Sequence, residues 1–255
     1  MNNAFFSKSC LHAVSAAALL VTAATFAQAG PVGLQNGDFS SNGGQGQLTY
    51  NTTLDSWTAG GKEGDYGSSS RAPVFVFASS NYAGSVSGDA FMGNVGFFNL
   101  TAPPTGSYFI AADGDSKWAG SLSQTVNGLD AGHTYDLKFN WAGAQQTGFS
   151  GPTTESWQVS FGGSTQSTST VNTPSQGFSG WQTATLSFTA GSASQLLSFL
   201  AIGTPSGQPP WLLLNGVSLT DTTTPPVPEP GTVAMLAVGL AGLALLRRRS
   251  QRSAD

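Results

Sequence analysis

Apolar and polar residues alternate along the middle of the chain, and this alternation restricts the folds that the chain can adopt. In residues 135–141, Tyr, Leu, Phe and Trp alternate with Asp, Lys and Asn, and residues 157–161 repeat the pattern. Side chains at every second position share one face of a strand, so each segment predicts a β-strand with one buried face. Residues 196–202 and 211–219 are apolar on both faces, which predicts central strands.

Further strands are expected at 74–78, 108–111, 121–126 and 184–188. Turn sequences rich in Gly, Asn and Pro separate the strands. No amphipathic helical stretch is convincing between the two ends of the chain. The sequence therefore predicts an all-β fold for residues 30–221, a two-sheet antiparallel β-sandwich or jelly roll.

The first 29 residues have the features of a helical secretory signal peptide. Lys8 precedes a small and apolar run, and Ala27 and Ala29 fit the small-x-small rule for cleavage by signal peptidase. We expect the mature chain to begin near Gly30. Cleavage removes Cys10, the only cysteine, which excludes disulfides and thiolate zinc sites from the mature chain.

The C-terminal end has three parts. Residues 222–231 form a Pro-rich linker, which we expect to be extended. Residues 232–246 are small and apolar and predict a transmembrane helix, although the run is at or below the usual spanning length. Residues 247–255 form a basic tail. Its cluster of positive charge predicts a cytoplasmic tail, with the main domain on the other side of the membrane.

The order of these C-terminal elements is itself a motif. Val227, Pro228, Glu229 and Pro230 precede the apolar run, and the cluster Arg247, Arg248 and Arg249 follows it. This arrangement resembles the PEP-CTERM sorting signal of Gram-negative bacteria. The resemblance implies export across the inner membrane, transient membrane anchoring and processing by an exosortase near the Pro-Glu-Pro element. The protein would then reach the cell surface or the extracellular matrix, in a bacterium that makes exopolysaccharide and biofilm.

A second resemblance covers nearly the whole mature domain. It rests on the order of five segments: Leu34–Ser40, Ala112–Gly114, Gly120–Val126, Gly132–Leu137 and Leu213–Leu219. This order is similar to the galactose-binding-like jelly roll of carbohydrate-binding modules and bacterial surface proteins. The resemblance implies two antiparallel sheets face to face, often with a structural calcium ion.

The family's usual calcium ligands are only partly matched here. The family has an acidic residue after the first Phe and an Asp in the final strand, where this chain has Ser40 and Asn215. Neither can supply the carboxylate charge that calcium sites normally use. Asp38 is the nearest carboxylate that would compensate. Apart from this possible structural calcium, we expect no cofactor, because the chain has no phosphate loop, dinucleotide fingerprint or zinc spacing.

Asp113-Gly114-Asp115 is the densest acidic segment, and three interpretations remain open for it. The two carboxylates are candidate calcium ligands together with Asp38. They are also candidates for a catalytic acid and base, with Glu155 as the partner in a glycoside hydrolase. The simplest interpretation is a turn before the strand at residue 121.

His133 is the only histidine left after signal cleavage. A catalytic triad would need a serine and a carboxylate beside it, and no nucleophile motif supports that arrangement. Its place after Ala131-Gly132 and before a strand favours a surface turn.

Several aromatic residues lie in Gly- and Ser-rich segments. The sequence Gly-Phe-Ser-Gly occurs twice, at 148–151 and 177–180. Exposed rings stack on sugar faces, and neighbouring amides bind sugar hydroxyls. The candidate sugar-binding residues are Trp118, Gln145, Phe149, Phe178 and Trp181. The alternative is that these rings plug the ends of the sandwich.

Charge limits the possible partners. Between Gly30 and Val227 the chain has four basic and eleven acidic residues, a net charge of −7. This excludes a nucleic-acid partner and repels anionic glycans unless divalent cations bridge them. Three hypotheses follow for the domain: a non-catalytic module that binds carbohydrate such as exopolysaccharide, a structural protein of the biofilm matrix, or a glycoside hydrolase.

Overall fold

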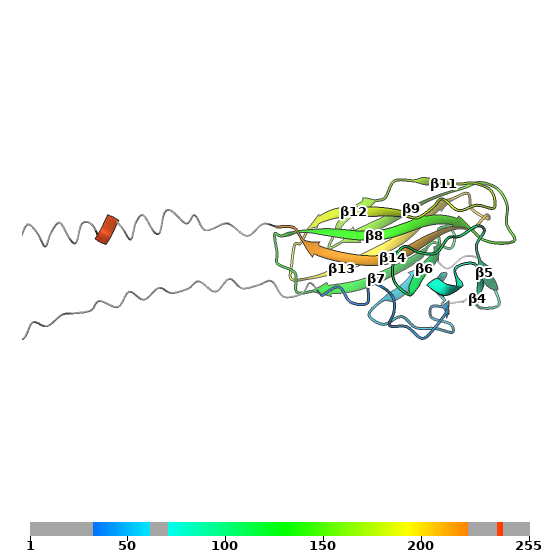
Figure 1. Cartoon of the computed structure of the whole chain (residues 1–255), viewed down its shortest axis with the longest axis horizontal. Helices are drawn as coiled ribbons and strands as arrows, with labels where there is room; N and C mark the ends of the chain where they lie inside the picture. The colour runs from blue at the N-terminus through cyan, green and yellow to red at the C-terminus, as the bar shows by residue number, and fades with distance from the viewer. Residues whose placement is uncertain (1–32, 62–70, 224–238, 242–255) are drawn as a thin grey trace, which may run out of the picture. The chain divides into compact units, whose positions relative to one another are not determined.

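The computed structural model describes residues 33–61, 71–223 and 239–241 (Figure 1). Its strands follow the alternation of the sequence. In β9 (Thr153–Phe161) every second side chain is buried, and β8 (Thr134–Gln145) begins with the same pattern. The all-β sandwich expected from the sequence is therefore confirmed.

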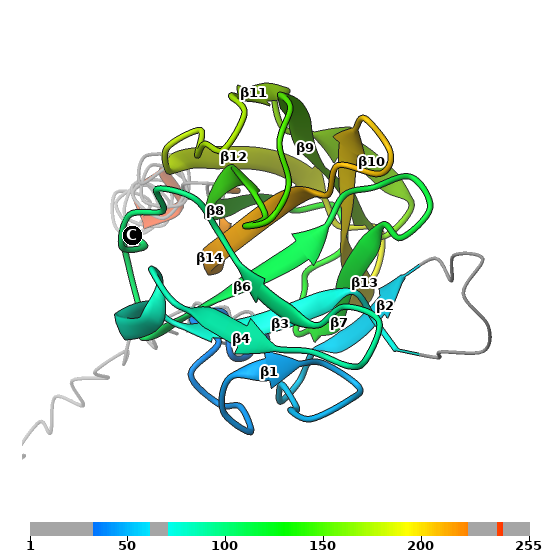
Figure 2. The ribbon, with the colours of Figure 1, turned by 90° about the vertical axis from the view of Figure 1, so that its right-hand side faces the viewer.

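The strands form two large antiparallel sheets, which Figure 2 shows from the end of the domain. The first sheet has the order β1-β3-β6-β14-β8-β12, and the second has the order β10-β9-β13-β7-β2, with β11 pairing β9. The bounds of the remaining strands of the first sheet are β1 (Gly46–Gln47), β3 (Val74–Ala78), β6 (Tyr108–Asp113), β12 (Gln182–Thr189) and β14 (Pro210–Asp221). Those of the second sheet are β2 (Thr58–Gly61), β7 (Gly120–Asn127), β10 (Ser164–Ser167), β11 (Val171–Thr173) and β13 (Ser194–Thr204).

The main core lies between the two sheets and is rich in aromatic rings. The Phe199 ring, on β13, meets Phe139 and Trp157 edge-on, with ring centroids 5.1 Å and 5.8 Å away. Trp57 lies 6.2 Å from the same ring and 5.8 Å from Phe39. Each such buried ring contributes roughly 2–3 kcal/mol to folding, so the core needs no cross-link.

A second core covers the outer face of the first sheet. Phe75, Phe109 and Trp211 lie on this face and are fully buried. The hairpin of β4 (Ser85–Ser87) and β5 (Asn94–Gly96), together with the segment that follows it, packs against them. The part of the first sheet formed by β3, β6 and the first half of β14 is therefore buried on both faces, which accounts for the apolar character of β14 on both sides.

Unlike β14, the strand β13 is buried on one face only. It is central in its sheet, as expected from the sequence, but only one of its apolar faces is buried. Leu196 is 54% exposed and Ile202 is 40% exposed. No second layer of described residues covers this outer face, so the second sheet is open to solvent along β13.

Asn215 is a buried polar residue in the middle of β14. Its Oδ1 accepts hydrogen bonds from the backbone N and the Oγ1 of Thr105, at 3.2 Å and 2.7 Å. Its Nδ2 donates to the carbonyl oxygens of Thr105 and Tyr108, at 2.7 Å and 2.9 Å. The register of β14 against β8 shifts just after this residue, where Gly216 has a φ of 63°. The side chain thus ties the segment before β6 to the bulge.

The two ends of the chain are largely outside the described residues. The signal peptide at 1–29, most of the linker at 222–231, most of the helix at 232–246 and the tail at 247–255 all lie there. Residues 239–241 are helical. Within the described residues, no helix has the length and apolar character needed to cross a membrane.

We predict that Asn215→Ala lowers the free energy of unfolding by about 2–3 kcal/mol, because it removes the hydrogen bonds that a fully buried side chain makes to Thr105 and Tyr108. Chemical denaturation of the variant measures this loss. The matched control is Asn172→Ala on β11, whose side chain is exposed and whose removal should change stability by less than about 0.5 kcal/mol. Equal effects of the two substitutions would contradict the role assigned to Asn215.

Candidate functional site

The open face of the second sheet carries no charged side chain among the residues that the structure describes. The outward side chains of β13 form an aliphatic ridge made of Leu196, Leu200 and Ile202. Ser198 interrupts this ridge. The neighbouring strands line this ridge with hydroxyl and amide groups: Ser121, Ser123 and Thr125 of β7, and Thr154, Ser156, Gln158 and Ser160 of β9. In a domain of net charge −7, a neutral surface of this extent is distinctive.

The pairing of the strands fixes how these groups meet. Leu200 lies between Ser121 and Gln158, while Ser198 lies between Ser123 and Ser160. Directly opposed residues in an antiparallel pair have Cβ atoms about 5 Å apart. Apolar and hydroxyl groups therefore alternate over a short repeat on this face.

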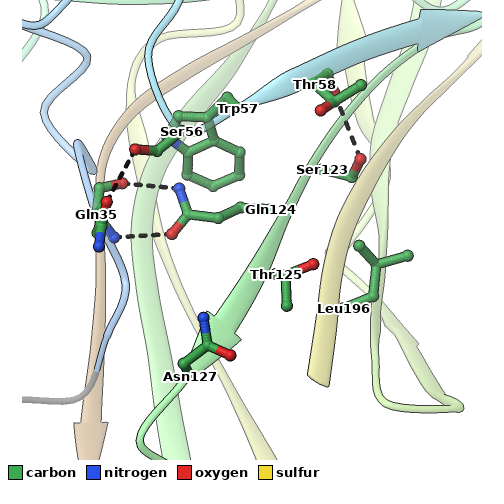
Figure 3. A pocket seen from close by; sticks show the side chains of 9 residues that line it. All are labelled: Gln35, Ser56, Trp57, Thr58, Ser123, Gln124, Thr125, Asn127 and Leu196. Carbon is green, nitrogen blue, oxygen red and sulfur yellow. Dashed lines mark hydrogen bonds between the residues drawn. The ribbon is translucent and has the colours of Figure 1, made fainter. Parts of the chain in front are cut away.

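One end of the face is hollowed, at the junction of β2, β7 and β13 (Figure 3). The hollow has a volume of about 460 Å³. It is lined by Gln35, Ser56, Trp57, Thr58, Ser123, Gln124, Thr125, Asn127 and Leu196. All of its polar groups are uncharged amides and hydroxyls.

Hydrogen bonds hold the wall of this hollow in place. The Gln35 backbone N donates to Gln124 Oε1 at 2.7 Å, and Gln124 Nε2 donates to the Gln35 carbonyl at 2.8 Å (Figure 3). Ser56 Oγ donates to Gln35 Oε1 at 3.0 Å. Trp57 is mostly buried, and its Nε1 donates to the Asn36 carbonyl at 3.0 Å. The wall is therefore preformed, whereas Thr125 and Leu196 expose their side chains beside it.

The structure places two of the predicted sugar-binding aromatics on the second core. The Trp181 ring meets Phe109 and Phe178 edge-on, at 6.0 Å and 6.1 Å between centroids. Its Nε1 donates to the Thr101 carbonyl at 3.1 Å. Both Phe178 and Trp181 pack partly buried against that core, so their position corresponds to the plugging alternative.

The two Gly-Phe-Ser-Gly loops come together through Gln145. This side chain is fully buried and is therefore not available to a ligand. It donates from Nε2 to the Gly151 carbonyl, and its Oε1 accepts from the Gln176 backbone N, each at 2.5 Å. Phe149 remains 37% exposed on the first loop. Gln145 thus holds the loops and does not line a groove.

Trp118 lies elsewhere, in the segment between β6 and β7. Its ring is half-buried and packs against Phe91, with centroids 4.5 Å apart. None of the candidates Trp118, Phe149, Phe178 and Trp181 lines the hollow between β2, β7 and β13.

Asp113 and Asp115 are both buried and form the turn that was the simplest expectation. Asp113 Oδ1 accepts from the Asp115 backbone N at 2.8 Å. Asp115 accepts from the backbone N of Lys117 and the Oγ of Ser206, both at 2.9 Å, and from the backbone N of Gly207 at 2.5 Å. Asp115 therefore connects this turn to the loop between β13 and β14.

The predicted calcium ligands are not brought together. Asp38 is exposed, and its Oδ1 accepts from the backbone N and Oγ of Ser40. Among the described residues, Asp38, Asp113 and Asp115 do not form a group of ligand atoms at metal-binding distances. At Asn215, the amide nitrogen occupies the space between two carbonyl oxygens. These two carbonyl oxygens accept hydrogen bonds from Asn215 and are therefore not available as cation ligands.

Glu155 is fully buried, which argues against the predicted hydrolase pair. Its Oε2 accepts from Thr173 Oγ1 at 2.6 Å, and a Cβ added at Gly143 would lie 2.4 Å from that Oε2. Burial raises the pKa of Glu155 to about 7 and that of Asp113 to about 7, where the charge of Asp115 adds to the effect. Sugar hydrolysis requires both carboxyl groups to reach the glycosidic bond, and these do not reach the surface.

His133 is on the surface, as expected for a turn, and contacts carboxylates. Its Nδ1 lies 2.7 Å from Asp221 Oδ2. No local pattern in the sequence predicts this contact, because Asp221 is 88 residues away from His133.

The comparisons with known proteins identify the sorting motif. The model of the PEP-CTERM protein-sorting motif matches residues 226–249. No curated protein matches the chain. Among solved structures, the chain is similar to a family 61 carbohydrate-binding module in complex with β-1,4-galactotriose. The two chains are 18% identical with a TM-score of 0.41, and the match covers 75% of this chain and 99% of that one.

Two further structures are similar at the same level. One is a family 4 carbohydrate-binding module, at 18% identity and a TM-score of 0.38, covering 73% of this chain and 98% of that one. The other is a tandem of family 22 modules of Xyn10C from Paenibacillus barcinonensis, at 16% identity and a TM-score of 0.41, covering 82% and 49%.

We predict that the domain is more stable at pH 5 than at pH 8. Asp113 and Glu155 have higher pKa values folded than unfolded, so the folded state binds more protons between about pH 4 and pH 7. Their contribution is present at low pH and is lost as the pH rises towards 7. From pH 5 to pH 8 the loss is roughly 2 kcal/mol for each group.

Urea denaturation at both pH values measures this difference. The double variant Asp113→Asn, Glu155→Gln removes both titrations and should make the profile between pH 5 and pH 8 clearly less steep; the slope that remains comes from His133, whose pKa its hydrogen bond with Asp221 raises. A profile as steep as that of the unmodified chain would contradict the assignment.

Proposed function

We propose that this chain is an exported protein of the cell surface or extracellular matrix whose open sheet face binds a neutral polysaccharide without cleaving it. One observation carries the proposal: the outer face of the second sheet is uncharged, rich in hydroxyl and amide groups, and hollowed beside Leu196. The sorting motif at 226–249 supports the export.

The chemistry of this face matches that of a sugar chain. Sugars present C–H surfaces, which pack against apolar groups such as Leu196 and Leu200, and hydroxyls, which bond to amides and to Ser and Thr. A neutral glycan has no charged group that must lose its hydration when it binds to this face. An anionic glycan would face a domain of net charge −7.

The shape of the site favours weak, repeated contacts. The hollow is open, and no described aromatic ring stands free above it, because Trp57 is packed into the core. Single contacts of this kind give dissociation constants of about 10 μM to 1 mM. Many copies on a surface would raise the effective affinity by multivalency.

The same face supports binding more than catalysis. Its described side chains include no carboxylate, and the candidate acids Asp113, Asp115 and Glu155 are buried elsewhere. A hydrolytic mechanism would need an acid and a base at the sugar, which this face does not present.

The structural-matrix hypothesis also has an observation in its favour. The exposed Leu196 and Ile202 lie on one face and would be buried if two copies of the domain packed face to face. In this case the domain would assemble through itself and need no glycan. Sedimentation of the domain with and without polysaccharide separates the two functions.

The proposed route begins with signal peptidase at Ala29. The chain then remains anchored by its C-terminal helix, with Arg247, Arg248 and Arg249 in the cytoplasm. An exosortase would recognise Pro228, Glu229 and Pro230 and release the domain. Pro228, Glu229 and Pro230 would be recognised by that enzyme and would perform no chemistry of their own.

We predict that Thr125→Asp weakens polysaccharide binding at least tenfold, because the new carboxylate loses its hydration when the ligand covers this face. Affinity electrophoresis against neutral and acidic polysaccharides measures the retention. The matched control is Thr185→Asp on β12, an exposed threonine of the first sheet. If both variants are retained as strongly as the unmodified chain, the open face is not the binding site.

We predict that Glu229→Ala blocks processing of the C-terminal segment in the host. The variant should keep its full mass and stay in the membrane fraction, whereas the unmodified chain is released. Thr224→Ala in the same linker is the control and should be processed normally. Release of the Glu229 variant at the normal rate would show that this glutamate is not part of the recognised element.

A further inference from the structure

A mixed cluster of histidine and aspartate lies at the end of the last strand, apart from the open face. Asp221 is the final residue of β14, and Asp130 and His133 belong to the turn that precedes β8. The backbone joins these elements closely: the Thr222 N donates to the Thr134 carbonyl at 2.9 Å. The His133 carbonyl in turn accepts from the Ala190 N at 2.8 Å.

Three potential ligand atoms converge at this place. His133 Nδ1 lies 2.7 Å from Asp221 Oδ2 and 4.0 Å from Asp130 Oδ2. One ligand atom of each residue lies within 4.8 Å of the other two. Among the described residues, no other group of three or more His, Cys, Asp or Glu side chains reaches this spacing.

One carboxylate of the cluster and the backbone of the turn are held by hydrogen bonds outside the cluster. The Thr223 N donates to Asp221 Oδ1 at 2.8 Å, which leaves Asp221 Oδ2 directed at the imidazole. The Asp130 N donates to the Tyr135 hydroxyl at 2.8 Å, which fixes the backbone of the turn. The fold therefore places Asp221 and the turn that carries Asp130 and His133 side by side, and a bound ion would replace the direct contact between His133 Nδ1 and Asp221 Oδ2.

We propose that Asp130, His133 and Asp221 bind a divalent transition-metal ion of the zinc type. A neutral imidazole and two carboxylates are ligands that zinc accepts, and the two negative charges balance the ion. The imidazole would bind through Nδ1 and keep its proton on Nε2. Calcium is a poorer fit, because calcium sites are built from oxygen ligands.

The cluster is accessible and keeps room for further ligands. The side chain of Asp130 is 57% exposed and that of His133 is 39% exposed, whereas Asp221 is 17% exposed. Three protein ligands leave a fourth position on a tetrahedral ion for water or another oxygen. The bound ion joins the turn before β8 to the point where the chain leaves the sandwich.

Titration calorimetry of the full chain in detergent with zinc chloride tests the site. We expect Asp130→Asn to weaken zinc binding at least tenfold and His133→Ala to remove the site. Asp136→Asn is the control, because this aspartate is on β8 and accepts from Ser187 instead. It should bind zinc as the unmodified chain does, and calcium should bind the unmodified chain at least 100-fold more weakly than zinc.

The variants also separate a metal site from a structural contact. The Asp130 carboxylate is 57% exposed and lies 4.0 Å from His133 Nδ1, so Asp130→Asn should change the melting temperature little in the absence of metal. Zinc should raise the melting temperature of the unmodified chain and that of Asp136→Asn, and should raise that of Asp130→Asn much less. Equal zinc binding by all three variants and the unmodified chain would overturn the proposal.

Discussion

The burial of β14 on both faces is the constraint on which the rest of the domain depends. This strand pairs with β6 on one side and β8 on the other, and each of its first six residues is buried. Leu212 and Leu214 belong to the main core, while Trp211 and Leu213 belong to the second core. The two cores are therefore joined through a single strand. The β4–β5 hairpin and the segment after it cover the first sheet, and no described segment covers the outer face of the second sheet.

The sequence predicted the strands well and the environment of their faces less well. Alternation at 135–141 and 157–161 identified one buried face each, since period two is a local property of the chain. It could not distinguish β14 from β13, because both segments are apolar on both sides. Whether a face is buried depends on what packs over it, and that is decided by residues as distant as Phe97.

The candidate site was harder to predict for the same reason. The aromatics Phe178 and Trp181 looked available in the sequence because their neighbours are Gly and Ser, but those small residues let the loops fold back on the second core. The open face was missed because Ser and Thr are common throughout the chain. A signal was present in β7, where outward positions 121, 123 and 125 are all hydroxyl residues. The turn at Asp113 and Asp115 was predictable, because Asp-Gly favours turns locally.

The position of β14 also governs the order in which the chain can complete its structure. A central strand of the first sheet, β14, is the last strand among the described residues, and the sorting motif follows only a few residues after Asp221. Until this strand has emerged, β6 and β8 have no partner between them and the first sheet consists of two separate parts. The domain can therefore finish folding only when the chain has been synthesised as far as the end of β14. Completion of the fold and synthesis of the sorting motif are therefore consecutive events on the same short stretch of chain.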